Sequence, residues 1–254
     1  MSKYTILDKI GRGRFGIVFK VIHNENNKHY VLKYINSKHS IDAQYEIDTL
    51  KILKREKLPY IVNLVEEYIT HNLSILLVFD YIHCVDLHTF IHSNTISTSS
   101  SIKISIIKDM IRGLHLIHSM NLVHLDIKPH NILIDGLYSI KYIDFGNACE
   151  DDHHQRYRRY CGTIQYMDPH MIERNINSFE DAQHADIWSL GVTIYNLVHG
   201  ELPWKQRNKN RMKKEISSTR RIYSEHTRFS DMINNMLWKD RNKRYSLERL
   251  LNLV

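Results

Sequence analysis

The sequence predicts an α+β fold in two lobes: a small five-stranded antiparallel sheet with one helix, followed by a mainly helical part. Residues 1–82 contain short runs of β-branched and aromatic residues between turn-forming residues, which is the pattern of strands. Later apolar residues recur at helical spacing. Because the pattern changes near residues 80–86, we expect lobes of residues 1–82 and 83–254.

The first lobe contains the predicted sheet. Its strands are expected at residues 4–7, 17–21, 29–35, 61–65 and 73–82. Between the third and fourth strands, apolar residues from Tyr45 to Leu58 recur at helical spacing, and Pro59 ends this helix.

The second lobe opens with a long helix, expected at residues 102–119. Ser101 is its expected N-cap. Its buried stripe is expected to consist of Ile102, Ile106, Met110, Leu114 and Ile117. The later expected elements are strands at 132–135 and 140–143, an apolar helix at 185–199 and helical segments within 228–253.

Composition excludes several classes of protein. Nine glycines and four prolines are too few for a collagen-like or Pro-rich chain, and the three cysteines lack metal-binding spacing. No apolar run is long enough to span a membrane and no signal peptide is evident, so we expect an intracellular protein, cytoplasmic or nuclear, without a membrane partner. The net charge of +7 gathers partly in residues 205–221, either as a solvated helix face or as a surface for an acidic partner.

A glycine-rich loop joins the first two expected strands, with the sequence Gly11-Arg12-Gly13-Arg14-Phe15-Gly16. Glycine lets a backbone approach phosphate groups and offer its N–H donors. A dinucleotide-binding fold would follow such a loop with a helix, and here a strand follows. A simple glycine hairpin is the alternative interpretation of this motif alone.

Lys33 ends an apolar strand, where a lysine needs an anionic partner. Glu46 on the following helix is the candidate, and two solvated charges are the alternative. A sharper cluster follows, because Asp126, Asn131 and Asp144 lie beside short apolar runs that should be buried.

In this order the motifs resemble those of the eukaryotic-type protein kinases, over nearly the whole chain. The matching segments are residues 11–18, Lys33, Glu46, residues 124–131, residues 144–146, 162–169, 186–191, 202–204 and 240–244. The resemblance implies a bilobal protein-kinase fold that forms a single domain of residues 1–254, with protein substrates.

The resemblance also implies ATP and Mg²⁺ (or Mn²⁺) as cofactors and a role for each matched residue. Lys33, oriented by Glu46, would bind the α- and β-phosphates, and Asn131 and Asp144 would hold the metal ion. Asp126 would accept the hydroxyl proton, and Lys128 would contact the γ-phosphate. Further ATP contacts are expected from Gly11, Arg12, Gly13, Arg14, Phe15, Gly16, Val18, Val31, Asp80, Tyr81, Ile82 and Leu133. An internal spine is expected from Leu50, Leu64, Phe145 and His124, anchored by Asp186.

Two residues match the serine/threonine kinases rather than the tyrosine kinases. These are Lys128, two positions after Asp126, and Thr163, which would position the substrate. The expected activity is therefore transfer of the ATP γ-phosphoryl group to protein serine or threonine hydroxyls.

The segment after Asp144-Phe145-Gly146, the D-F-G motif, departs from the family. Leu125 replaces the arginine that usually receives an activation-loop phosphate, and residues 147–161 contain no Ser or Thr. We therefore expect activity without loop phosphorylation. Pairing of Glu150, Asp151 and Asp152 with Arg156, Arg158 and Arg159 could order the loop instead, and solvated charges are the alternative.

Two other positions also differ from the family. His170 stands where a glutamate usually pairs with a buried arginine, here Arg244, and Asp168 is the nearest replacement. His130 stands where kinases that prefer basic substrates often carry glutamate. Together with residues 205–221 and the loop arginines, it favours substrates with acidic residues near the target, and the alternative is no clear preference.

Three other functions compete with this interpretation. A pseudokinase scaffold would keep the fold without catalysis, although every matched catalytic residue is present. A small-molecule kinase would not need residues 162–169 to hold a peptide. Nucleic acid is not expected as a direct ligand, because a nucleic-acid-binding module would explain only the charge.

Overall fold

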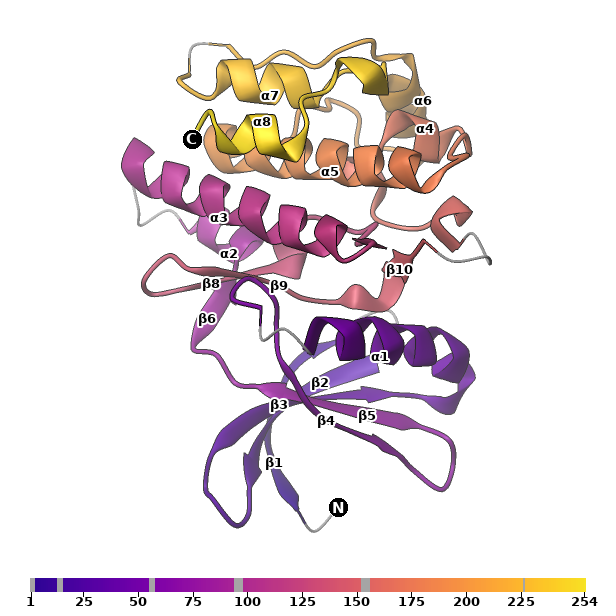
Figure 1. Ribbon diagram of the computed structural model, residues 1–254. Helices are drawn as coiled ribbons and strands as arrows, with labels where there is room; N and C mark the ends of the chain where they lie inside the picture. Colours follow the sequence, from indigo (N-terminus) through magenta and orange to yellow (C-terminus); the bar gives the residue numbers. More distant parts are fainter. Residues whose placement is uncertain (1–2, 13–15, 55–57, 94–97, 152–155, 226) are drawn as a thin grey trace. The chain divides into compact units, whose positions relative to one another are not determined.

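The structure is a computed structural model that describes residues 3–12, 16–54, 58–93, 98–151, 156–225 and 227–254 (Figure 1). The chain forms two compact units, Met1–His83 and Cys84–Val254. The fold is a mixture of helices and strands, with an antiparallel five-stranded sheet and a helical part, as the sequence predicts.

The first unit is built on one antiparallel sheet with the strand order β1-β2-β3-β5-β4. The strands are β1 (Tyr4–Arg12), β2 (Gly16–His23), β3 (His29–Ile35), β4 (Leu64–Ile69) and β5 (Ile75–Asp80). A short turn η1 (Ser37–His39) leads into helix α1 (Ser40–Lys54), which packs beside β4. Leu76 and Val78 of β5 join Val21 and Leu32 in a buried cluster on one face of this sheet.

The predicted boundaries of three elements in this unit were wrong. The strand expected at residues 4–7 is β1, which continues to Arg12. The strand expected at residues 61–65 is β4, which runs from Leu64 to Ile69 instead. This strand lies at an edge of the sheet, where polar side chains such as Glu66 and Glu67 reach solvent without leaving the sheet. Helix α1 begins at Ser40, before the first apolar residue of the predicted pattern, and residues 55–57 near its expected end lie outside the described part.

The second unit is built mainly from helices. These are α2 (Leu87–His92), α3 (Ser100–Ser119), α4 (Pro169–Ile172), α5 (Phe179–His199), α6 (Lys209–Ser218), α7 (Ser230–Met236) and α8 (Leu247–Leu251). Helix α3 packs on α5 and α8, and α5 also packs on α7 (Figure 1). The core of this unit therefore lies around α5, which is buried along most of its length.

The helix starts in this unit correct two predictions. Ser99, rather than Ser101, caps α3, because its hydroxyl accepts the backbone N–H of Ile102. Helix α5 begins at Phe179, six residues before the expected start at residue 185, because Ser178 and Asp181 form a reciprocal capping box. Caps and polar first turns lie outside the apolar pattern, so apolar spacing alone starts these helices too late.

Two small antiparallel sheets position the polar motifs. One contains β6 (Cys84–Asp86), β8 (Ile132–Asp135) and β9 (Ile140–Tyr142), and the other contains β7 (Leu122–Val123) and β10 (Cys149–Glu150). The polar loop after β7 leads to β8, and the turn after β9 leads to β10, so both are held at each end by a paired strand. Short helical turns complete the unit at η2 (Pro129–Asn131), η3 (Phe145–Asn147), η4 (Arg156–Arg158), η5 (Ile164–Tyr166) and η6 (Arg241–Lys243).

Within the described ranges, every helix is too short or too polar to cross a lipid bilayer.

Candidate active site

The polar loop after β7 is held by a buried carboxylate of α5. Asp186 is fully buried, and its Oδ1 accepts the backbone N–H of Leu125 at 2.8 Å. Its Oδ2 accepts the backbone N–H of His124 at 2.8 Å and lies 3.0 Å from Nε2 of His118. Leu125 adopts a left-handed backbone with φ of 60°, which is costly for a residue with a Cβ, and these bonds help to fix it.

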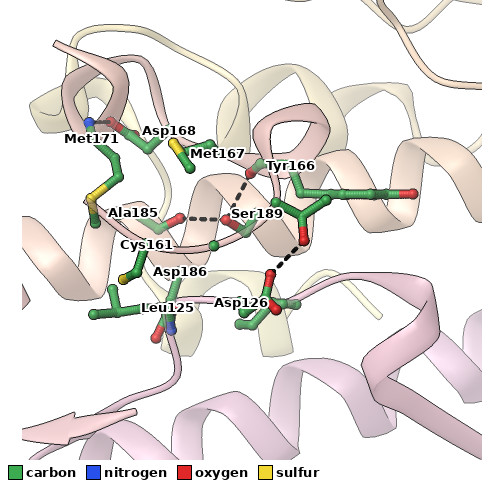
Figure 2. A pocket seen from close by; sticks show the side chains of 13 residues that line it. Leu125, Asp126, Cys161, Tyr166, Met167, Asp168, Met171, Ala185, Asp186 and Ser189 are labelled. Atoms are coloured by element: carbon green, nitrogen blue, oxygen red, sulfur yellow. Dashed lines mark hydrogen bonds between the residues drawn. The ribbon is translucent and has the colours of Figure 1, made fainter. Parts of the chain in front are cut away.

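Asp126, Lys128 and Thr163 form a closed hydrogen-bond network. The Lys128 Nζ lies 2.8 Å from Asp126 Oδ2 and 2.7 Å from Thr163 Oγ1, and the Thr163 hydroxyl donates to Asp126 Oδ1 at 2.8 Å. Asp126, which Figure 2 labels, and Thr163 both line a small pocket. A carboxylate that holds a hydroxyl in this way is placed to align a second hydroxyl and to accept its proton.

Gly162 brings the Thr163 segment against this loop. Its φ is 94°, and a Cβ added there would lie 2.7 Å from the carbonyl oxygen of Leu125. Only glycine fits both the backbone conformation and the close approach. The Ser189 hydroxyl of α5 donates to the Tyr166 carbonyl (Figure 2). The Trp204 indole donates to the Gln165 carbonyl, so the other end of the segment is also fixed.

Asn131 joins the same loop from η2. Its Nδ2 donates to the Asp126 carbonyl at 2.9 Å and to Asp126 Oδ2 at 3.2 Å, and the side chain is buried. These bonds use the nitrogen of the amide and leave Oδ1 as the atom suited to a metal ion.

The expected metal ligand Asp144 lies in the turn after β9. His124 ties this turn to the loop, because its Nε2 donates to the carbonyl of Ile143 at 3.2 Å and its ring lies 4.9 Å from that of Phe145. Asp144 has a left-handed backbone with φ of 62°, a conformation that non-glycine residues adopt mainly at constrained sites.

Asn131 and Asp144 have the donor atoms that Mg²⁺ prefers. Both offer oxygen, and Mg²⁺ usually takes one or two protein ligands together with water and phosphate oxygens. Among the residues that the structure describes, no three His, Cys, Asp or Glu side chains gather to form a complete metal site. Asn131 and Asp144 are therefore candidate ligands for Mg²⁺, whose other ligands would be water or phosphate oxygens.

Lys33 and Glu46 form an ion pair in the first unit. The Lys33 Nζ lies 2.7 and 2.9 Å from the two carboxylate oxygens, and the side chains are 11% and 2% exposed. An ammonium group held by two oxygens has a fixed position, so it can offer its charge to a phosphate at small entropic cost.

The strand register places several expected nucleotide contacts on one face of the first sheet. Val18 pairs with Lys33, and Val31 lies two residues before Lys33 on the same strand. Because side chains alternate between faces, Val18, Val31 and Lys33 share one face. Arg12 ends β1 and is exposed, Asp80 ends β5, and Tyr81 and Ile82 follow it half-buried. Leu133 belongs to β8 of the second unit, and residues 13–15 lie outside the described part.

The first and last glycines of the loop differ in their surroundings. A Cβ on Gly16 would lie 1.9 Å from the carbonyl oxygen of Tyr34 in the neighbouring strand, which no side chain can satisfy. A Cβ on Gly11 would make only ordinary contact with Val18, at 3.6 Å. Sheet packing therefore requires glycine at position 16, whereas position 11 has no such structural requirement.

Leu125 lies in an apolar cluster and anchors the segment after the D-F-G motif. It is 6% exposed and shares the cluster with Cys149, Tyr157 and Met167. Tyr157 is itself buried and packs edge-on against Phe179 of α5. Apolar packing thus occupies the position where the family usually has an arginine. Of the predicted charge pairs in this segment, Asp152 lies outside the described residues, and Arg158 donates to the carbonyl of Asn177.

Arg244 pairs with Asp168, the residue suggested as a substitute for the missing glutamate. The Arg244 Nη1 lies 2.6 Å from Asp168 Oδ2, and both side chains are buried. The guanidinium also donates to the carbonyls of Trp238 and His184. Burial and, secondarily, the neighbouring Arg244 lower the pKa of His184.

The loop of residues 124–131, called the catalytic loop below, takes part in a cluster of three imidazoles that the sequence did not predict. His88 stacks on His130 at a ring distance of 4.1 Å and lies 4.5 Å from His92. Burial, followed by the charges of the other two rings, lowers the pKa of His88. His88 and His92 are one turn apart on α2, but only the fold brings them to His130.

Lys33 of the five-stranded sheet pairs with Glu46 of helix α1. A loop with an aspartate, a lysine and an asparagine is held by the buried Asp186. These two features define a protein kinase. The protein kinase domain family matches residues 4–253, and the chain belongs to the eukaryotic-type protein kinases.

Three relatives illustrate the similarity. The chain is 31% identical, over 96% of its length, to a probable serine/threonine-protein kinase of Dictyostelium discoideum, of which it covers 54%. It is 33% identical, over 81% of its length, to the striated muscle preferentially expressed protein kinase of Danio rerio, of which it covers 7%. It is 30% identical, over 82% of its length, to ribosomal protein S6 kinase alpha-2 of Homo sapiens, of which it covers 28%. The chain thus spans about half or less of the length of these curated relatives.

Proposed function

We propose that this protein is an active serine/threonine kinase that transfers the γ-phosphoryl group of ATP to protein hydroxyls. The network of Asp126, Lys128 and Thr163 is the main support for this proposal. It combines a base, a cation and a positioning hydroxyl at one point, which is what phosphoryl transfer to an alcohol needs.

Each residue of the network has a chemical task. Asp126 aligns the incoming hydroxyl and accepts its proton as the new O–P bond forms. Lys128 lies beside Asp126 and offers positive charge to the γ-phosphoryl oxygens as the bond to the β-phosphate breaks. Thr163 fixes the rotamers of both side chains through its single hydroxyl.

The cofactors are assigned to residues of each unit. In the first unit, Lys33 neutralises phosphate charge while Glu46 holds it in place. In the second, Asn131 and Asp144 hold Mg²⁺, which neutralises charge on the phosphates when bound. The retention of all these groups favours a catalyst over a scaffold.

The choice of serine and threonine over tyrosine rests on Lys128 and Thr163. Both residues match the serine/threonine pattern, and both contact Asp126 through their side chains. The name of the Dictyostelium discoideum relative, a probable serine/threonine-protein kinase, supports the same assignment for this chain.

We further propose that activity does not depend on phosphorylation of residues 147–161. Leu125 links the catalytic loop to Tyr157 and Cys149 by apolar packing. Burial of a leucine contributes about 1.5–3 kcal/mol, comparable to a charge-assisted hydrogen bond. This packing supplies a connection that other members of the family make with arginine and a phosphate.

Substrates with acidic residues near the target suit the charge of the second unit. His130 is exposed within the loop of residues 124–131, and most cations of residues 205–221 are exposed. A positive surface raises the local concentration of acidic peptides.

The proposal is tested by transfer of phosphate from ATP and Mg²⁺ to casein, histone and basic nucleoproteins. Asp126→Asn should lower the rate by about 10²–10⁴-fold, the usual contribution of a general base, and Lys33→Met should also abolish most transfer. Phosphoamino-acid analysis should find phosphoserine or phosphothreonine. ATP binding without transfer in the unmodified protein would support the scaffold instead. Transfer that phosphatase pretreatment abolishes would overturn independence from loop phosphorylation.

A further inference from the structure

We infer that Arg174 and Lys213, which flank the ring of Tyr160, form a subsite for an anionic group of the protein substrate. The group is a carboxylate or a phosphate within about three residues of the acceptor hydroxyl. This inference rests on the proposed kinase function and assigns its acidic specificity to particular residues.

Two cations from different parts of the second unit meet at Tyr160. The guanidinium carbon of Arg174, just after α4, lies 5.4 Å from the centre of the ring, and Nζ of Lys213 on α6 lies 4.9 Å from it. Tyr160 is 36% exposed and Arg174 is exposed, so the place where the cations converge is open to solvent.

The nearby carboxylates are already engaged elsewhere. Glu173, next to Arg174 in the chain, pairs with Lys239 at 2.6 Å. Glu215 on α6 accepts the backbone N–H groups of Lys205 and Gln206. Within the described parts of the chain, neither Arg174 nor Lys213 forms an ion pair. No carboxylate of the described residues therefore compensates their positive charge.

The cations lie within a short peptide's reach of the reacting groups. Gly162 is two residues after Tyr160, and a Cβ on Gly162 would lie 3.8 Å from Asp126 Oδ1. Two residues of extended chain span about 7 Å at most. A substrate whose hydroxyl meets Asp126 can therefore place a side chain from a neighbouring position at Arg174 and Lys213.

The present contacts with the ring do not prevent anion binding. A cation over an aromatic face at an exposed site is held weakly, whereas a charge-assisted hydrogen bond from lysine or arginine to an oxyanion is much stronger. The ring can orient the two cations until a substrate arrives. We expect the subsite to act on KM more than on kcat, because it lies away from the transferred phosphoryl group.

The test uses serine peptides in a neutral background, each with one aspartate, phosphoserine, alanine or arginine at a single position within three residues of the acceptor. The unmodified kinase should use at least one acidic peptide about tenfold better than its alanine counterpart, through a lower KM. A larger gain for phosphoserine than for aspartate identifies phosphate as the preferred group, and equal gains identify a general preference for negative charge.

Variants then assign the preference to the subsite. Lys213→Ala and Arg174→Asn should each remove most of it, and Lys213→Glu should favour the arginine peptide instead. Asparagine is chosen at position 174 because the backbone there is left-handed, with φ of 58°, which asparagine tolerates. Lys214→Ala is the matched control, since Lys214 is an exposed lysine on the same helix that points about 100° away. Tyr160→Phe keeps the ring and should leave the preference unchanged.

Three results would overturn the subsite. The first is equal use of acidic and alanine peptides by the unmodified kinase. The second is an acidic preference that survives both Lys213→Ala and Arg174→Asn in variants whose thermal unfolding is unchanged. The third, no transfer to any peptide, would overturn the kinase function and the subsite together.

Discussion

The guanidinium of Arg244 lies 2.6 Å from Oδ2 of Asp168, and both side chains are buried. The partner of this arginine thus comes from two residues before His170, the position where the family usually supplies a glutamate. Asp168 also caps α4 by accepting the backbone N–H groups of His170 and Met171 on its other oxygen. One carboxylate therefore caps α4, at the end of residues 162–169, and also neutralises the buried Arg244.

Removal of the Asp168 charge should destabilise the protein strongly. Asp168→Asn keeps a capping oxygen but leaves a buried arginine unpaired, so we expect a loss of about 3–5 kcal/mol in urea unfolding. Glu173→Ala breaks the more exposed pair with Lys239 and should cost at most about 1 kcal/mol. Equal effects of the two changes would contradict a buried pair at Arg244.

An arginine at position 125 should not be accommodated. Leu125→Arg would place a charge in an apolar cluster, and we expect a loss of at least about 2 kcal/mol, as for other buried unpaired charges. Leu125→Met keeps the volume and should cost less than about 1.5 kcal/mol. Urea unfolding of dephosphorylated protein measures both. A fully stable Leu125→Arg protein would argue against the apolar link.

The Thr163 hydroxyl should matter to the rate of transfer. Thr163→Val removes both hydrogen bonds and should lower kcat by about 10–100-fold, because a bond to a charged group contributes about 1.5–3 kcal/mol and 1.36 kcal/mol is tenfold. Thr163→Ser keeps the hydroxyl and should retain most of the activity. Steady-state kinetics with one peptide provides the comparison. A valine variant as active as the serine variant would remove Thr163 from the network.

The two described loop glycines should respond differently to alanine. Gly16→Ala brings a methyl group against the Tyr34 carbonyl and should lower stability by about 1–3 kcal/mol, the usual cost of overpacking. Gly11→Ala should leave stability unchanged or slightly raised, yet weaken ATP binding if its backbone approaches phosphate. Thermal unfolding without nucleotide and titration with ATP separate these effects. If Gly16→Ala were as stable as Gly11→Ala, the sheet constraint would be refuted.

The sequence predicted the architecture and the polar cluster around Asp126, and the predictions were wrong at the ends of several elements. The five-stranded sheet, the buried stripe of α3 from Ile106 to Ile117, and strands β8 and β9 follow from periodicity, which reports burial directly. The starts of α3 and α5 depend on caps at Ser99 and Ser178, and β4 depends on its edge position. The caps are local polar contacts and the edge position is set by neighbouring strands, so apolar spacing reveals neither.

Contacts between distant residues were the least predictable part of the site. Asp168 could be suggested as the partner of Arg244 only because a buried arginine needs a negative charge. The convergence of Arg174 and Lys213 on Tyr160, and of His88 and His92 on His130, left no trace in local sequence. These groupings arise from the packing of α2, α4 and α6.

Asp186 holds the catalytic loop through the backbone N–H groups of His124 and Leu125, and not through their side chains. A backbone donor is the same whichever amino acid carries it. These two bonds therefore do not depend on which side chain residue 125 carries. In such a loop an arginine or a leucine can stand at position 125 with the same backbone contacts, provided that the surrounding side chains fit it.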